Sequence, residues 1–598
     1  MVRRAEKQKS GGVSGLLKRT IPVLRWAPLY TRAALADDAL AAFIVTIMLI
    51  PQSLAYALIA GLPPEAGLYA SMLPLVAYAV FGTSTALAVG PVAVISLMTA
   101  ATVGDFAARG TADYASVALA LAFLTGLILI GMGALRLGFL ANFLSHPIMS
   151  AFITASGVLI AAGQLKHVLG VEAAGDTLVE IVSSLAAHMP ATHGPTLLMG
   201  AAVIGFLVFS RSALKPLLLR AGLQDRPASL IARAAPLFAV FASIGAVAAL
   251  GLEAHGVAIV GDTPQGLPPF AAPAFDADLW RALLGPALLI AIIGYVESVS
   301  VAQTLAAKRN EKIDLDQELI GLGAANVAAG VSGGFPVTGG FARSVVNFDA
   351  GARTPAAGGF AAIGIALAAL FLTPLLYDLP KATLAATIIV AVLALVDIGA
   401  MGRTLRYSRG DFAAMMATIA GVFLFGVEAG VVAGVILSIL FLLYRASRPH
   451  SAIVGQVPET QHFRNVRRHD VITSPSVVSL RIDGDFFFAN ARFIEDRILD
   501  AARETPGARH VVLMCSAVNA IDTTALEALE TVNRRLKERD VSFHVSEVKG
   551  PVMDRLKRSH FLGALTGAAH LSQFDAMHAL DPETFLAPRA AERATPAP

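Results

Sequence analysis

The sequence predicts an α-helical polytopic membrane protein that ends in a small α/β domain. Of its 598 residues, 56% are hydrophobic and only 15% are charged, and the mean hydropathy is +0.67. A soluble protein of this length is rarely so apolar, so most of the chain is expected to contact the lipid bilayer. The composition becomes polar after Tyr444. The net charge of +3 gives no reason to expect a nucleic-acid partner.

About fourteen apolar segments, judged by windows of roughly 20 residues, lie between Ala34 and Tyr444. Glycine, proline or charged residues separate them. Their approximate centres are Val45, Leu75, Ile95, Thr125, Thr154, Ile204, Phe241, Ile292, Ala324, Val345, Leu367, Val390, Ile419 and Ile436. We therefore expect a transmembrane transport domain over residues 34–446.

Basic residues predict the orientation of these segments. Lys and Arg cluster in loops that follow even-numbered segments, namely residues 211–233, 308–312 and 403–409. By contrast, residues 167–195 and 253–280 contain no Lys or Arg. The positive-inside rule then places the N-terminal segment, residues 1–33, and the C-terminal domain in the cytoplasm. Residues 1–20 lack a signal-peptide core, and we expect a multi-pass protein of the cell inner membrane.

Two short apolar segments are interrupted by glycine, proline and hydroxyl residues. They are Phe81–Leu97 and Gly333–Asn347, about 250 residues apart. Paired interrupted segments in the two halves of a membrane protein are typical of the midplane binding site of a carrier. The sequence therefore predicts a secondary transporter.

The C-terminal part alternates strand-like and helix-like segments, which predicts a sheet covered by helices. We expect a polar linker over 447–468, the α/β domain over 469–585 and a disordered tail over 586–598. No group of residues there has the pattern of a catalytic site, so no enzyme activity is expected. The single cysteine, Cys515, lies in an apolar run and is expected to be a buried filler rather than a reactive thiol.

Several segments resemble the SulP (sulfate permease) family of anion transporters. The N-terminal signature is the most specific match, and the last of the matching regions resembles a STAS domain. The segments are Pro51–Ala57, Ala60–Ala70, Phe81–Ser84, Gly261–Pro268, Gly333–Pro336 and residues 470–585. The resemblance implies fourteen spans in two inverted seven-span repeats, divided into core and gate domains. It also implies an elevator-like movement in a homodimer.

An anion site follows if the third and tenth spans are half-helices that meet at their N-termini. Each end then offers free N–H groups and about half a positive charge, which favours an anion without a metal or cofactor. The residues expected to line this site are Ala88, Val89, Gly90, Thr338, Gly339, Gly340, Phe341 and Ala342. Similarity to the family places Arg343 close to the anion, where its guanidinium can pair with oxygen atoms. The alternative is that Arg343 only anchors the cytoplasmic interface.

Glu297 is the candidate for coupling. An intramembrane carboxylate is costly unless it is paired, protonated or hydrated, so it is a functional residue by default and a plausible proton carrier. In the sodium-linked pattern of the family, a hydroxyl ligand follows the acid four residues later, but Val301 stands there. Because this removes one hard oxygen ligand, sodium is less favoured than a proton. A purely structural hydrogen bond from Glu297 remains the alternative.

Three further residues complete the candidate set. Gln52 and Tyr56 on the first span could contact the anion, with Pro51 breaking that helix, or could only bond neighbouring helices. Thr523 matches the phosphorylatable position of bacterial STAS proteins. The alternative there is a structural turn, because Thr524 and Glu527 have capping-box spacing.

These observations favour secondary active transport of a small oxyanion, with sulfate first and C4-dicarboxylate or bicarbonate next. The anion and the choice between proton symport, exchange and uniport stay open. A passive anion channel would use the same residues. A function of another class, a membrane-anchored STAS scaffold that binds a cytoplasmic protein, would not need the interrupted segments.

Overall fold

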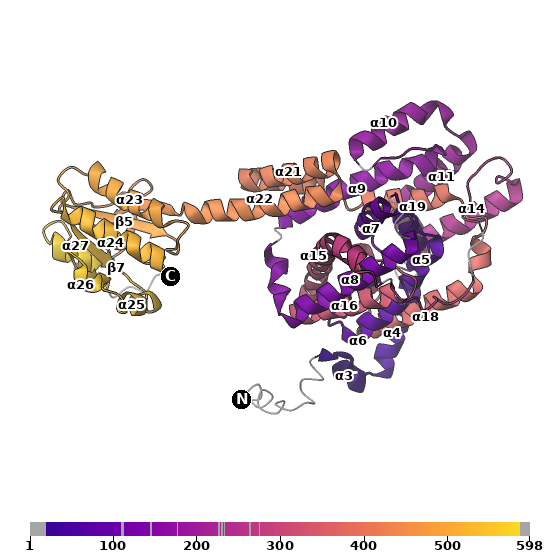
Figure 1. The fold of residues 1–598 in the computed structure, drawn as a ribbon, viewed down its shortest axis with the longest axis horizontal. Coiled ribbons are helices and arrows are strands. Elements are labelled where there is room, and N and C mark those ends of the chain that lie inside the picture. Colours follow the sequence, from indigo (N-terminus) through magenta and orange to yellow (C-terminus); the bar gives the residue numbers. More distant parts are fainter. Residues whose placement is uncertain are drawn as a thin grey trace. The chain divides into compact units, whose positions relative to one another are not determined.

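The computed structural model describes residues 20–108, 113–143, 146–175, 177–224, 228, 231–232, 234–261, 265–273 and 275–585. The chain divides into two compact units at Ser438 and Ile439, inside the helix α22 (Figure 1). The expected N-terminal segment falls within the described residues only from Thr20 onward. The expected disordered tail, 586–598, lies outside them.

The described part of the first unit is almost entirely helical. Its longer helices are α4 (Arg32–Ile59), α6 (Leu73–Phe81), α7 (Ala93–Ala108), α8 (Tyr114–Ala134), α9 (His146–Leu169), α10 (Leu178–His188), α11 (Gly194–Phe209), α14 (Ala235–Leu250), α15 (Ala277–Lys308), α16 (Leu315–Gly330), α17 (Phe341–Asp349), α18 (Ala356–Phe371), α19 (Lys381–Leu393), α20 (Ile398–Tyr407), α21 (Arg409–Phe425) and α22 (Val427–Ser447). Shorter helices are α3 (Val23–Trp26), α5 (Pro64–Tyr69) and α12 (Lys215–Arg220), and a π-helical segment covers Ser210–Leu214. Every predicted span centre falls inside one of these helices.

Within the described residues, six helical segments are long and apolar enough to cross a membrane. They are Arg32–Ile59, Tyr114–Ala134, Pro147–Leu169, Gly194–Arg220, Ala277–Lys308 and Lys381–Tyr407. The other predicted centres lie in shorter helices, so the count of fourteen spans stays a prediction. The helix α4 continues through Pro51, and the expected break at this proline is therefore wrong. The ring removes one N–H donor without ending the helix.

The backbones of α8 and α16 pack closely together at glycine residues. A Cβ on Gly126 would lie 2.6 Å from the backbone nitrogen of Val327, and one on Gly323 would lie 2.8 Å from the carbonyl oxygen of Gly126. Small residues allow backbones to approach in this way in membrane proteins. In the same unit α18 packs against α4, and α19 against α9.

Two very short strands connect the halves of the first unit. The strand β1 (Val89–Gly90) pairs antiparallel with β2 (Thr338–Gly339), with Val89 opposite Gly339 and Gly90 opposite Thr338. The helix α7 begins at Ala93 and α17 begins at Phe341, shortly after these strands. The pairing therefore brings the N-terminal ends of two helices together from positions far apart in the sequence.

The second unit is an α/β domain, as predicted. Its sheet has the order β4-β3-β5-β6-β7-β8, with β5 to β8 parallel and β3 antiparallel to β5. The strands are β3 (His450–Gln456), β4 (Phe463–Asn465), β5 (Val477–Asp483), β6 (His510–Met514), β7 (Ser542–Ser546) and β8 (Ala569–His570). The helices are α23 (Ala491–Glu504), α24 (Thr523–Lys537), α25 (Gly550–Leu556), α26 (Phe561–Ala564) and α27 (Gln573–Leu580) (Figure 1).

The sheet begins earlier than the sequence pattern indicates. Both β3 and β4 lie inside residues 447–468, which were expected to form a linker. The stretch is polar and basic, so it lacks the apolar pattern from which a strand is predicted. The strand β3 is only partly buried, and its first residue, His450, is exposed.

Candidate functional site

A small cavity of about 40 Å³ lies in the first unit where α4, α7, α9, α15, α17 and α19 meet. It contains residues from both interrupted segments and both candidate charged groups. The lining residues are Gln52, Tyr56, Val92, Ala93, Val94, Ile153, Gly157, Ile160, Glu297, Gly340, Phe341, Ala342, Arg343, Val392 and Leu395. Seven of the predicted site residues, Gln52, Tyr56, Glu297, Gly340, Phe341, Ala342 and Arg343, are therefore brought together.

The N-terminal end of α17 forms one wall of this cavity. Its N-cap residue is Gly340, which has no side chain to accept a hydrogen bond from the first turn. Gly340, Phe341 and Ala342 all line the cavity. The opening turn of a helix presents N–H groups and a partial positive charge, so this wall favours an anion.

Arg343 lies one residue further into α17 and is 2% exposed. Its guanidinium rests against two glycines, because a Cβ on Gly340 would lie 2.9 Å from Nη2 and one on Gly90 would lie 3.0 Å from Nη1. Among the described residues, neither Nη1 nor Nη2 has a hydrogen-bond partner. A buried cation without acceptors is costly, and a bound anion would remove that cost.

Glu297 enters the same cavity from α15 and is 9% exposed. Its Oε2 also has no hydrogen-bond partner within the described part of the chain. Two later hydroxyls of α15 are occupied by the helix itself, since Ser300 Oγ donates to Val296 O and Thr304 Oγ1 donates to Ser300 O. A carboxylate oxygen that no protein group satisfies can take up a proton or contact a bound ion.

Five predicted lining residues, Ala88, Val89, Gly90, Thr338 and Gly339, are buried but do not line the cavity. They form the paired strands and the residue before them. The Thr338 hydroxyl donates to Gly294 O at 2.6 Å and lies 2.6 Å from Ser298 Oγ, which also accepts from Gly339 N at 2.8 Å. Thr338 therefore attaches β2 to α15, next to Glu297.

The sequence patterns did not indicate two polar residues of α17, Ser344 and Asn347, which bond to the segment before β1. The Ser344 hydroxyl accepts from Ala88 N at 3.0 Å and donates to Gly340 O at 2.7 Å. Asn347 Nδ2 donates to Ala86 O at 3.1 Å. Their spacing of three residues on one helix face was a usable signal. The apolar lining from α9 and α19 carried no such signal, because it resembles any other span.

A second cavity of about 530 Å³ shares four lining residues with the first, namely Gln52, Phe341, Ala342 and Leu395. Arg211 and Lys215 also line it. Arg211 lies in the π-helical segment and donates from Nη1 to Val390 O at 3.2 Å. The larger cavity is thus a basic vestibule beside the small one.

In the second unit, Thr523 is the exposed first residue of α24. The N-cap is Asp522, whose carboxylate accepts from Ala525 N at 2.9 Å and Phe488 N at 2.7 Å. The expected capping box at Thr524 and Glu527 is therefore wrong. Burial raises the pKa of the Cys515 thiol to about 12, as suits a buried filler. Within the described ranges, no group of three or more His, Cys, Asp or Glu side chains is arranged to hold a metal ion.

Comparison with family models identifies both units. Residues 35–418, which contain the whole cavity lining, match the model described as the sulfate permease family. The chain belongs to this family. Residues 468–573 match the STAS domain, so the sheet unit of this sulfate permease family member is a STAS domain.

Relatives match along most of their length. The chain is 34% identical to "Sulfate transporter 4.1, chloroplastic" of Arabidopsis thaliana over 90% of this chain and 79% of that protein. It is also 34% identical to a probable sulfate transporter of Mycobacterium tuberculosis over 91% of this chain and 96% of that protein. The murine Solute Carrier 26 family member A9 anion transporter in the inward-facing state has the same fold, with a TM-score of 0.84, 23% identity and coverage of 97% and 98%.

Proposed function

We propose that this protein is a secondary transporter of small oxyanions, with sulfate as the first candidate. The observation that carries the proposal is the Arg343 guanidinium, which is buried, lines the cavity and has two nitrogens without partners among the described residues. It lies beside the uncapped N-terminal end of α17. Guanidinium and helix N-terminus together supply the donors that a tetrahedral or planar oxyanion needs.

The arrangement of donors favours a compact anion. The unpartnered guanidinium nitrogens of Arg343 lie together at one end of α17, which suits a single oxyanion such as sulfate or bicarbonate better than a four-carbon dicarboxylate with a charge at each end. The names of the plant and mycobacterial relatives favour sulfate. A similar transmembrane fold, with a TM-score of 0.57 and 21% identity, belongs to a cyanobacterial bicarbonate transporter, and bicarbonate therefore stays the second candidate, ahead of C4-dicarboxylates.

We propose further that Glu297 couples anion entry to a proton. Its unpartnered Oε2 lines the cavity that holds Arg343. Protonation would neutralise one of the charges that must cross the membrane with a divalent oxyanion. Sodium is the less favoured coupling ion because Val301 offers no oxygen ligand.

The remaining parts of the proposal concern the assembly. The protein would lie in the cell inner membrane. The vestibule with Arg211 and Lys215 would connect the anion site to the cytoplasmic side, because positively charged loops face inward. Family membership supports alternating access by an elevator-type movement of a homodimer as part of this proposal. The STAS domain would then be cytoplasmic and available to a protein partner, with exposed Thr523 as a phosphorylation site.

The test is uptake into proteoliposomes of labelled sulfate, bicarbonate and succinate, each with and without an inward proton gradient. We expect saturable sulfate uptake that is concentrative only with the gradient. Glu297→Gln mimics the protonated carboxyl group, so it should abolish proton-driven accumulation and leave sulfate exchange measurable.

Three outcomes would contradict parts of this proposal. Accumulation by Glu297→Gln with a proton gradient alone would remove the coupling role. Uptake that is never concentrative would indicate a passive anion channel. Absence of transport for all three anions in folded protein would leave the STAS scaffold as the better function.

A further inference from the structure

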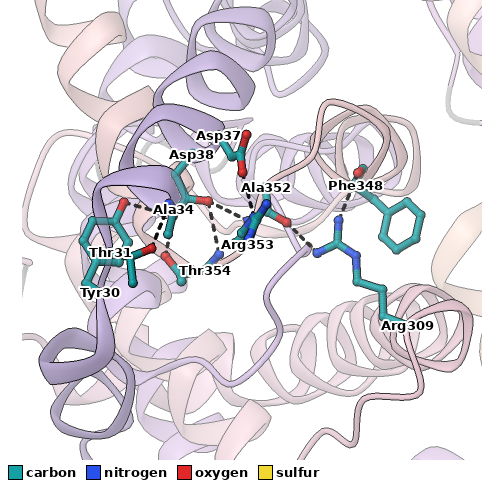
Figure 2. Close-up of polar contacts among 10 residues, drawn as sticks. All are labelled: Tyr30, Thr31, Ala34, Asp37, Asp38, Arg309, Phe348, Ala352, Arg353 and Thr354. Carbon is teal, nitrogen blue, oxygen red and sulfur yellow. Dashed lines mark hydrogen bonds and ion pairs between the residues drawn. The ribbon is translucent and has the colours of Figure 1, made fainter.

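Three helices carry the charged or polar residues that line the cavity. Hydrogen bonds also connect these helices, or the chain next to them, at a place outside the cavity. Helix α4 carries Gln52 and Tyr56, α15 carries Glu297 and α17 carries Arg343. The early part of α4, the end of α15 and the chain after α17 meet in a polar cluster (Figure 2). We call Asp38, Arg309 and residues 348–354 the clasp.

Asp38 is the buried acceptor of the clasp and is 0% exposed. Its Oδ1 accepts from Arg353 N at 2.6 Å and from Thr354 N at 3.2 Å. Its Oδ2 accepts from Thr354 Oγ1 at 2.6 Å and from Tyr30 OH at 3.0 Å (Figure 2). A carboxylate with this many donors is well satisfied, and it fixes the segment after α17 to the second turn of α4.

Arg309 is the donor of the clasp. It is the C-cap residue of α15, and its guanidinium donates to Ala352 O and, at 3.0 Å, to Phe348 O (Figure 2). The guanidinium also lies 4.2 Å from the centre of the Phe348 ring. Since Phe348 belongs to the last turn of α17, Arg309 caps the C-terminal end of that helix, where a cation is favourable.

The length of α17 makes these contacts important for the site. The helix has only 9 residues, too few to be stable in isolation, so it depends on its contacts with the rest of the chain. Arg343 and Phe348 are five residues apart, which is about 7.5 Å along a helix axis. A tilt at the clasp therefore moves the guanidinium within the cavity, and displacements of this kind weaken a bound geometry strongly.

We propose that Asp38 and Arg309 are positioning residues for the anion site, acting through α17 on the Arg343 guanidinium. The proposal rests on the proposed function, because it assumes that Arg343 holds the transported anion. Neither residue lines the cavity, so neither contacts a bound anion directly.

The test compares clasp variants with a matched control in sulfate uptake by proteoliposomes. Asp38→Asn loses the acceptor for Thr354 Oγ1 and Tyr30 OH, and Arg309→Gln loses the cap of α17. We expect each to raise the KM for sulfate roughly tenfold, and Arg309→Lys to recover part of the loss. The control is Asp37→Asn, which removes the neighbouring ion pair to Arg353, with side chains 39% and 61% exposed. Its KM should stay within about twofold of the wild type, because exposed ion pairs contribute little.

The same substitution made in Arg343→Ala protein distinguishes a positioning role from a general effect on protein stability. In Arg343→Ala protein, Asp38→Asn should change the KM by less than about twofold, while its effect on the thermal unfolding midpoint persists. An independent structural role would give the same KM ratio on both backgrounds and would overturn the proposal. If Asp38→Asn does not fold, Thr354→Val removes one donor and should give a smaller increase of KM with the same dependence on Arg343.

The outcomes also separate this inference from the proposed function. If the wild type transports no anion, the proposed function is wrong and this inference is overturned with it. If the wild type transports sulfate but Arg343→Ala leaves the KM unchanged, Arg343 does not hold the anion, and this inference is overturned while the transport function stands. If Arg343→Ala raises the KM while Asp38→Asn, Arg309→Gln and Thr354→Val keep the wild-type value, only the positioning role is overturned.

Discussion

Glu297 and Glu318 are both buried glutamates of the membrane unit, yet their surroundings are opposite. Glu318, 0% exposed, accepts from Tyr78 OH at 2.7 Å, Thr83 N at 2.8 Å and Ser84 N at 3.0 Å, and also from Thr83 Oγ1. Glu297 has an Oε2 without any partner in the described part of the chain. Buried polar groups are nearly always satisfied, so the exception needs another explanation.

The difference distinguishes a structural charge from a charge available to a ligand. Glu318 attaches the chain before β1 to α16, and its hydrogen bonds are complete without any ligand. Glu297 and Arg343 lie at a cavity, and their missing bonds can be supplied by a proton and an anion. The following predictions test this contrast, beginning with the largest expected effect.

Removal of the satisfied carboxylate should be the most damaging change to folding. Glu318→Ala leaves the amides of Thr83 and Ser84 and the Tyr78 hydroxyl without an acceptor, and each unpaired group costs about 1–3 kcal/mol. We expect a total loss of about 3–5 kcal/mol, read as a lower thermal unfolding midpoint in detergent. The matched control is Glu311→Ala, an exposed acid that accepts from Thr85 Oγ1 at 2.8 Å. Equal midpoints for the two variants would contradict the structural role of Glu318.

Removal of the unsatisfied guanidinium should change binding instead of folding. Arg343→Ala should weaken sulfate binding by about 1.5–3 kcal/mol, roughly 10- to 150-fold, as expected for a charge-assisted hydrogen bond. The unfolding midpoint should be unchanged or higher, because a buried charge without partners is removed. Arg343→Lys should recover only part of the affinity, since an ammonium lacks the planar fork. Wild-type affinity in both variants would show that Arg343 does not hold the anion.

The smallest effect is expected in the STAS domain, where a buried histidine is satisfied only in its neutral form. The Nδ1 of His544 accepts from Ala568 N at 3.1 Å, and Nε2 lies 2.8 Å from Ser542 Oγ. Burial lowers the pKa of His544 to about 4. Since the unfolded chain binds this proton at a higher pH, stability should fall as the pH decreases from about 6.5 towards 4.

Hydrogen exchange of the β7 amides in the whole protein, corrected for the intrinsic effect of pH, measures this dependence. His544→Gln should flatten it, whereas His560→Gln, at an exposed position, should not. A wild-type domain whose protection does not change between pH 7 and pH 5 would be inconsistent with a neutral buried His544.

Much of the fold and the location of the candidate cavity followed from local features of the sequence. Apolar segments of membrane length predicted helices, because the bilayer requires backbone groups to be paired within each segment. The fold class and the family are confirmed, and the alternation of segments after Tyr444 correctly predicted a sheet with packed helices. The glycines and prolines of Phe81–Leu97 and Gly333–Asn347 indicated two interruptions that can be read directly from the chain, and the candidate cavity lies where α7 and α17 begin after them.

Only the tertiary structure decided which polar groups are satisfied. Thr338 and Arg343 belong to one interrupted segment, yet Thr338 bonds to α15 whereas Arg343 keeps two unpartnered nitrogens among the described residues. The same holds for Glu297 and Glu318, which composition cannot distinguish. Hydrogen-bond satisfaction depends on atoms that are hundreds of residues away, such as Ala88 for Ser344 or Thr354 for Asp38. These distances arise only when the two halves of the chain pack together, so no local pattern in the sequence carries them.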